Sequence, residues 1–212
     1  MKFFIISSGL QEIIEGSKIF PYFEAVYGSQ LAGDDEKGVL QYIKRCITYT
    51  EKTRYLFEIN KGIPPKDSHR DFVNEIVPME ERPIPFSRMI FIGDGLTDIP
   101  CFSLVKNGVR DDRGGIPFGI FDPRDEQSAR RALLKLLLPD RVEGAYTAKY
   151  GPLHDLGSAL RNTVTAMASL ESIREQPPWR PAPESETMKS SGPPIAIRSK
   201  KRRVESFKKK KH

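Results

Sequence analysis

Two carboxylates four positions apart follow an apolar run in the middle of the sequence. Residues 89–92 have the composition of a short buried strand, and Asp94 and Asp98 come after it in a turn that contains Gly93 and Gly95. The glycines allow a ligand to approach the backbone closely, and the acids supply the hard oxygen ligands that Mg²⁺ prefers. The same residue types also occur in solvated turns whose acids only cap the next helix. Taken alone, this stretch leaves both interpretations open.

A second group of polar residues follows the first apolar run of the chain. Residues 3–6 have the continuous apolar character of a parallel strand that is covered on both faces. Ser8 and Gly9 come next, in a turn that is expected to lead into a helix over residues 11–15. Hydroxyl groups and free amides at a helix N-terminus form an anion site, although Ser8 could equally be a simple N-cap.

A lysine is the third candidate. A helix is expected to open at residues 50–52, because Tyr55, Leu56 and Ile59 have the spacing of one buried helix face. Lys52 would then lie in the first turn, where a cation opposes the helix dipole. It is therefore either an ordinary solvated lysine or one that is held by an anionic neighbour.

The elements around these residues alternate between strands and helices. This order predicts an open, Rossmann-like parallel α/β sheet with flanking helices, with a hairpin or small cap-like excursion at about residues 30–49. Further strands are expected at 25–29 and 116–121, and helices at 99–105, at 125–138, from 156 onward and, as a polar helical segment, up to 77. Ligands of such sheets bind at the carboxyl ends of the strands, which is where Ser8, Asp94 and Asp98 are expected to lie.

The charge of the chain is concentrated in its C-terminal segment. Residues 174–212 contain twelve Lys and Arg against four Asp and Glu, a net charge of +8, whereas residues 1–173 carry a net charge of −2. Residues 1–173 are therefore not expected to form a nucleic-acid-binding domain. Residues 174–212, rich in proline and ending in basic runs, are predicted to be a disordered tail. The tail fits a nuclear-import signal or a patch for nucleic acid, and equally a solvated tail without a receptor.

The remaining composition predicts a soluble, cytoplasmic protein, with nuclear localisation as an alternative suggested by the basic tail. No apolar run is long enough for a signal peptide or a membrane span, so no membrane partner is expected. Cys46 and Cys101 have no metal-ligand spacing and are expected to be reduced and buried or half-buried.

Taken in order, residues 6–9, Lys52 and the block 92–100 resemble three sequence motifs of the haloacid dehalogenase-like (HAD) hydrolase superfamily, in its phosphoserine-phosphatase-like branch. The similarity extends over roughly residues 1–160 and leaves the tail outside. The block Gly-Asp-Gly-Leu-Thr-Asp-Ile-Pro, preceded by an apolar strand, is its most specific part. The resemblance implies a Mg²⁺-dependent phosphomonoesterase that acts on a small phosphorylated substrate.

The resemblance also implies a role for each matched residue. Ser8 and the Gly9 amide would bind phosphoryl oxygens, and Lys52 would neutralise the phosphoryl group, with Lys61 as a weaker candidate for that role. Asp94 would ligate Mg²⁺, and Asp98 would hold Asp94, a metal-bound water or Lys52. Phosphoryl transfer depends mainly on charge neutralisation and positioning, which these residue types provide.

One motif of the family is missing. The Asp-x-Asp block that supplies the nucleophile at the end of the family's first strand has no counterpart in these 212 residues, and the acids of segments 110–113 and 122–125 do not replace it. In the family that strand lies between those that end near Ser8 and Asp94. The resemblance therefore implies a HAD-like fold that is N-terminally incomplete and inactive as written. A truncated gene model, a decayed paralogue and a strand supplied by a partner all remain open, as does a non-catalytic phosphate-binding or regulatory protein.

Overall fold

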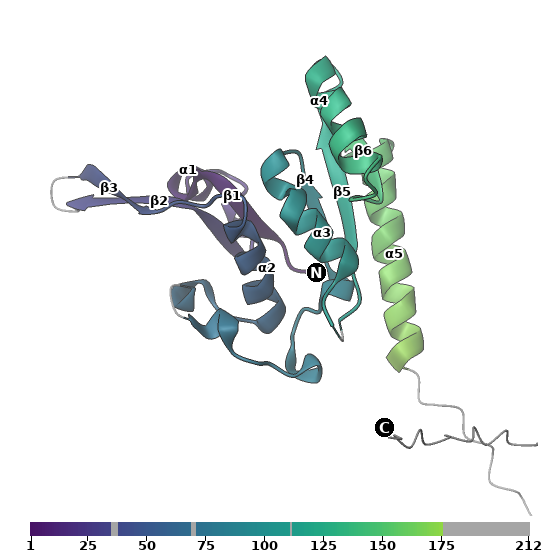
Figure 1. Cartoon of the computed structure of the whole chain (residues 1–212), viewed down its shortest axis with the longest axis horizontal. Helices are drawn as coiled ribbons and strands as arrows, with labels where there is room; N and C mark the ends of the chain where they lie inside the picture. The colour runs from purple at the N-terminus through teal and green to yellow at the C-terminus, as the bar shows by residue number, and fades with distance from the viewer. Residues whose placement is uncertain (35–37, 69–70, 111, 176–212) are drawn as a thin grey trace, which may run out of the picture. The chain divides into compact units, whose positions relative to one another are not determined.

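The computed structural model describes residues 1–34, 38–68, 71–110 and 112–175 (Figure 1). The chain divides into two units, Met1–Ile173 and Arg174–His212, and the fold below is that of the first unit. Apart from residues 174 and 175, the segment predicted to be a disordered tail lies outside the described residues. In chain order the main elements are β1 (Phe4–Leu10), α1 (Gln11–Glu15), β2 (Ala25–Asp34), β3 (Val39–Arg45), α2 (Glu51–Lys61), β4 (Ile90–Gly93), α3 (Ile99–Asn107), β5 (Ile116–Phe121), α4 (Glu126–Arg131), β6 (Gly144–Thr147) and α5 (Asp155–Glu175).

The described strands form two sheets of three strands each. In the first sheet β1 and β2 are parallel and β3 joins β2 antiparallel; in the second, β4, β5 and β6 are all parallel. The predicted α/β class, with parallel strands and flanking helices, is confirmed. Among the described residues the predicted open sheet is divided into two, because β1 and β4 are not paired with each other and no other described strand joins them.

The β2–β3 hairpin lies where the sequence predicts an excursion. Its strands cover Ala25–Asp34 and Val39–Arg45, with two irregularities in their register. Figure 1 shows the hairpin extending away from the rest of the first unit. Val39 and Tyr42 on β3 are exposed, whereas Ala25 and Tyr27, in the first half of β2, belong to the core.

Helix α2 lies at the centre of the larger core. Its buried face is formed by Tyr55, Leu56 and Ile59, as predicted from their spacing. The core also takes in residues of β1, β2, β4 and α3, among them Phe4, Ile6, Tyr27, Phe91 and Val105. The helix ends at Gly62, whose positive φ of 72° is the left-handed conformation that glycine adopts without strain. One helix therefore packs against strands of both sheets.

A second, smaller core lies beside β5 and contains Phe102, Ala132, Leu136 and Val142. The amphipathic helix predicted over residues 125–138 is observed as α4 followed by a π-helical turn, Ala132–Leu137. Strand β6 was not predicted, because its sequence, Gly-Ala-Tyr-Thr, lacks an apolar run and its extended form is fixed by pairing with β5.

Two other segments differ from the predictions. The polar helical segment expected up to residue 77 contains only single-turn 3₁₀ helices, Pro65–Asp67 and Asp71–Asn74, in its described part. Prolines that lack an amide donor favour such short turns over a continuous helix. Strand β1 continues to Leu10 instead of turning after residue 6, because its last residue pairs with Ser29 of β2 beyond a register shift. Among the described residues, no helix is both long and apolar enough to cross a bilayer.

Candidate functional site

The turn after β4 has its shape fixed by Asp98. The apolar strand Ile90–Gly93 ends at Gly93, and a short 3₁₀ turn, Leu96–Asp98, leads into α3. The Gly95 amide donates a hydrogen bond to Asp98 Oδ2 at 3.0 Å. A Cβ atom on Gly93 would lie 2.7 Å from the same carboxylate oxygen, so a side chain there would collide with Asp98. Glycine at position 93 is thus required by the close approach of this carboxylate.

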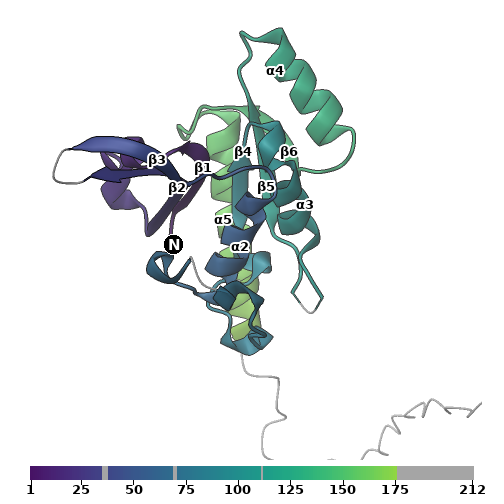
Figure 2. The same cartoon turned by 60° about the vertical axis from the view of Figure 1, so that its left-hand side comes forward.

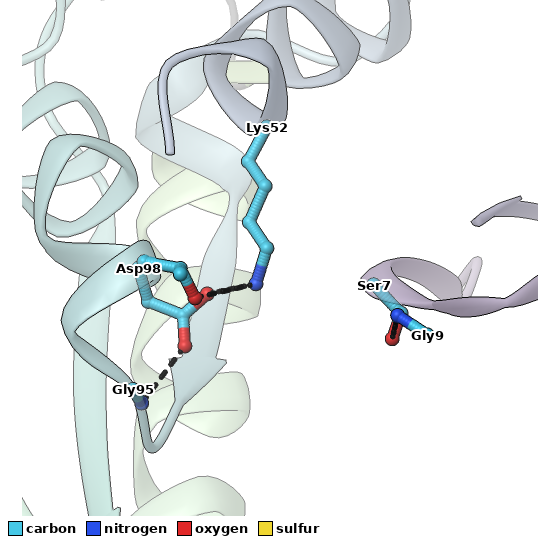
Figure 3. A network of polar contacts seen from close by, with 6 residues as sticks. Ser7, Gly9, Lys52, Gly95 and Asp98 are labelled. Carbon is cyan, nitrogen blue, oxygen red and sulfur yellow. Dashed lines mark hydrogen bonds and ion pairs between the residues drawn. The ribbon is translucent and has the colours of Figure 1, made fainter. Parts of the chain in front are cut away.

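Lys52 and Asp98 form a buried ion pair. The Lys52 ammonium donates to Asp98 Oδ1 at 2.7 Å and to Thr97 Oγ1 at 3.2 Å (Figure 3). The two charged side chains are only 8% and 6% exposed. Of the two interpretations of Lys52, the structure therefore supports the lysine held by an anionic neighbour. Asp98 makes no side-chain capping bond to α3, although its bond to the Gly95 amide caps the 3₁₀ turn Leu96–Asp98. Capping is therefore only part of the role of Asp98, because its other oxygen accepts from Lys52.

A buried residue of α3 lies close to the ion pair. Cys101 lies in the first turn of that helix and is fully buried. Burial raises the pKa of the Cys101 thiol to about 12, with a further contribution from the Asp98 carboxylate and an opposing one from Lys52. This thiol is therefore neutral at physiological pH and is not a candidate nucleophile.

Asp94 differs from Asp98 in both exposure and contacts. It is exposed, and its carboxylate makes no hydrogen bond or ion pair within the described part of the chain. No group of three or more His, Cys, Asp or Glu side chains among the described residues is arranged to hold a metal ion. Mg²⁺ is commonly held by one or two carboxylates together with waters and phosphate oxygens. Asp94, supported by Asp98, fits such a partial ligand set.

The N-terminal candidates are placed differently from the prediction. Ser8 and Gly9 are exposed and lie within the last part of β1, before the five-residue helix α1. The Gly9 amide donates to Ser7 Oγ at 3.0 Å, and the Ser8 carbonyl accepts from Ser29 Oγ at 2.9 Å. In Figure 3, Ser7 and Gly9 lie apart from the Lys52–Asp98 pair. The structure thus brings Lys52 and Asp98 together with the Asp94 turn, and no described hydrogen bond links Ser8 or Gly9 to them.

Two other polar residues singled out in the sequence have structural contacts. Lys61 donates to the carbonyls of Val73 and Glu75, both at 2.6 Å, and so anchors the loop after α2. Asp112 is 1% exposed and accepts from the Phe86 amide at 2.9 Å and from Asn60 Nδ2 at 3.0 Å. Neither residue lies at the Lys52–Asp98 pair. Asp111 lies outside the described residues.

Sequence reasoning did not assign a role to Thr97, whose hydroxyl accepts a hydrogen bond from Lys52. Its position next to Asp98, within the block 92–100, was the only available signal. The role of Ser7 as the partner of the Gly9 amide was missed because residues 7–10 were expected to be a turn.

Comparison with known proteins gives one informative similarity. An uncharacterized protein of Borreliella burgdorferi is 31% identical over 160 residues, which cover 69% of this chain and 53% of that protein. The chain thus spans about half the length of the curated relative it matches. No family model matches the chain, and no solved structure matches it.

Proposed function

We propose that this chain carries the phosphate- and Mg²⁺-binding part of a HAD-like phosphomonoesterase site at the carboxyl end of β4. The observation that carries the proposal is the buried Lys52–Asp98 ion pair, 2.7 Å long, next to the exposed carboxylate of Asp94, which has no partner among the described residues. A lysine is costly to bury, and the pair holds it at a strand end, where ligands of α/β sheets bind. A HAD-like hydrolase fold accounts for the order of these residues along the chain.

Each residue has a distinct task in this proposal. Asp94 ligates Mg²⁺ through its exposed carboxylate, and Asp98 holds the turn and the lysine in place. The Lys52 ammonium, which has a third donor beyond its bonds to Thr97 and Asp98, neutralises charge on a phosphoryl group. Bound Mg²⁺ supplies electrostatic stabilisation of the phosphoryl oxygens. Ser8 and Gly9 remain proposed phosphate ligands, and using the Gly9 amide in this way requires its bond to Ser7 to open.

The proposal includes an expected lack of turnover. No aspartate in the 212 residues is followed two positions later by another aspartate, so the nucleophile and acid/base of the family motif are missing. We therefore expect the chain to bind Mg²⁺ and phosphate but to hydrolyse a generic phosphomonoester at a rate no higher than a protein-free control. Clear turnover that Asp94→Asn abolishes would show that another residue acts as the nucleophile.

Metal binding tests the proposal directly, with Mn²⁺ as a probe of the Mg²⁺ site. We expect the electron paramagnetic resonance signal of free Mn²⁺ to fall when the protein is added and to recover with excess Mg²⁺. Asp94→Asn should weaken binding by about tenfold or more, since it removes a charged ligand. Asp71→Asn is the matched control, because Asp71 is an exposed acid in the 3₁₀ turn next to the C-terminal end of α2. Equal Mn²⁺ binding by the Asp94 variant and the wild type would refute the metal site.

The second candidate is a non-catalytic phosphate-binding or regulatory protein whose basic tail engages nucleic acid or an import receptor. The net charge of +8 in residues 174–212 favours it, because such a charge supports salt-dependent binding to phosphates. We propose that the protein is located in the cytoplasm or, if the basic tail acts as an import signal, in the nucleus.

A further inference from the structure

The helix that follows β5 presents four leucines to solvent. It consists of α4 and the π-helical turn Ala132–Leu137, which are continuous because Arg131 and Ala132 both have helical backbone angles. Its inner side contains Ala132 and Leu136, which are 4% and 2% exposed and belong to the core beside β5. The side chains of the outer side, the leucine face, are between 40% and 69% exposed; they are those of Leu133, Leu134, Leu137 and Leu138.

The π-helical turn brings these leucines together. The Leu138 amide donates to the Leu133 carbonyl at 2.9 Å, and the Arg141 amide donates to the Leu136 carbonyl at the same distance. Both bonds span five residues, whereas the bonds of an α-helix span four, so each turn is wider than an α-helical turn. Side chains four and five positions apart therefore lie next to each other, which joins the four leucines into one continuous face. Such π-helical segments are rare and occur often at functional sites.

The leucine face takes no part in the packing of the first unit. None of its four residues belongs to either of the two cores. In Figures 1 and 2, α4 lies at the edge of the first unit in both views. Single exposed leucines are ordinary on protein surfaces, but contiguous exposed apolar residues mark sites that bind a partner or a membrane.

The charged residues within this helix are all cations. Segment 127–139 contains Arg130, Arg131 and Lys135 and no aspartate or glutamate. Arg130 and Lys135 are exposed, Arg131 is half-buried, and none of the three forms an ion pair within the described part of the chain. The acids that follow the helix, Asp140 and Glu143, are already paired with Lys106.

This combination determines which kind of occupant fits the leucine face. Three cations without acidic partners favour an anionic occupant, and four neighbouring leucines favour an apolar one. A second copy of the chain would bring the same three cations against the face, so like charges would oppose its binding. A helix with leucines on one side and arginine and lysine beside them has the composition of helices that lie on anionic membranes.

We propose that the leucine face binds the surface of a bilayer that contains anionic lipid, with the helix lying in the plane of the membrane. The leucines enter the boundary between headgroups and acyl chains, and Arg130, Arg131 and Lys135 contact lipid phosphates. A helix bound in this way needs only one apolar face, so no spanning segment is required. Residues 174–212, with a net charge of +8, supply a second attraction to the same lipids.

The test measures binding of the full 212-residue chain to sedimented vesicles. Vesicles of phosphatidylcholine alone are compared with vesicles that also contain phosphatidylserine. Because the tail can bind anionic vesicles by charge alone, the decisive variant is Leu134→Ser/Leu138→Ser, which keeps every charge. The matched control is Leu170→Ser/Ile173→Ser, which changes two exposed apolar residues of α5 instead. Far-ultraviolet circular dichroism checks that each variant is folded.

We expect Leu134→Ser/Leu138→Ser to bind phosphatidylserine vesicles about tenfold more weakly than the wild type, and the α5 control to bind as the wild type does. Arg130→Gln/Lys135→Gln, which keeps the leucines, should also weaken binding and reduce its dependence on salt.

Amide hydrogen exchange locates the contact in the unmodified chain and so does not depend on the folding of any variant. Phosphatidylserine vesicles should slow exchange in segment 130–138. Glycerophosphoserine, which has the same headgroup without acyl chains, should leave it unchanged, because the proposed contact requires a bilayer and not a free phosphate.

Four results would overturn the proposal. The first two are equal vesicle binding by the leucine variant and the wild type, and unchanged exchange of segment 130–138 in the vesicle-bound chain, since either would leave the tail as the only contact. The third is equal binding to vesicles without phosphatidylserine. The fourth is a wild-type dimer in gel filtration that the leucine variant does not form, which would show that a second copy covers the face.

Discussion

Replacement of Lys52 by methionine gives the strongest test of the ion pair in the candidate site. The variant keeps an unbranched side chain in the same space but leaves Asp98 buried with only the Gly95 amide and without its cation. Because the two charged side chains are 8% and 6% exposed, water cannot replace the lost partner. Breaking a buried pair in this way costs about 3–5 kcal/mol of unfolding free energy. With a urea dependence of about 2 kcal/mol per molar, the unfolding midpoint should fall by roughly 2 M.

A double-mutant cycle separates the interaction from the other effects of each substitution. Asp98→Asn keeps an acceptor for the Gly95 amide but leaves Lys52 as the unpaired charge. The double variant contains neither charge, so it should be destabilised by about as much as one single variant or by less, and the two effects should not add. Unfolding is followed by far-ultraviolet circular dichroism, because Trp179, the only tryptophan, lies outside the described residues and cannot be assigned as a reporter of the core.

The control is an ion pair of similar length near the surface. Lys106 donates to Asp140 at 2.7 Å and also lies 3.3 Å from Glu143, but these two acids are 86% and 45% exposed, so Lys106→Met should cost no more than about 1 kcal/mol. A Lys52→Met variant that loses as little as this control, or a cycle in which the single effects simply add, would show that Lys52 and Asp98 are not a buried and mutually dependent pair.

Two further predictions concern other parts of the chain. In the native protein at pH 8, a maleimide should modify Cys46, which is exposed, but not Cys101, whose thiol is buried and remains neutral because its pKa is about 12. Cys101 should become reactive in denaturant, and rapid labelling of both thiols in the native protein, counted by mass spectrometry, would contradict its burial. Deletion of residues 198–212 removes most of the basic residues of the tail, so it should abolish salt-sensitive retention on a DNA column; a deleted chain that still elutes at the same salt concentration would rule out the tail as the nucleic-acid contact.

The elements predicted correctly are those whose signal is local. Strand β5 has the predicted bounds, residues 116–121, because an apolar run between turn residues needs no partner to be recognised. The buried face of α2 was likewise predicted from the spacing of Tyr55, Leu56 and Ile59. The exposure of Cys46 was missed, since the residue lies between apolar neighbours in the sequence but beyond the end of β3 in the fold.

The elements that were missed depend on contacts distant in sequence. The extension of β1 to Leu10 is stabilised by pairing with Ser29, and β6 exists because β5 offers it an edge. The partner of Lys52 is a similar case, because 46 residues separate it from Asp98. The sequence indicated that an anion could hold Lys52, and the resemblance implied Lys52 as one of three possible partners of Asp98, but only the fold decides between this pairing and a solvated lysine.

The two aspartates that resemble each other in the sequence therefore have different environments, and the proposal gives them different roles. Asp98 is 4% exposed and has one oxygen bound to Lys52 and the other to the Gly95 amide, so its substitution should affect folding before it affects any ligand. Asp94 is exposed and makes no described contact, so its substitution should leave stability within about 0.5 kcal/mol and change metal binding alone. Acidic residues that only solvate a turn remain exposed to water. Solvation of the turn therefore does not explain why Asp98 is buried against Lys52. In the proposed site, this contrast makes Asp94 the better marker of metal binding and Asp98 the residue that positions the turn.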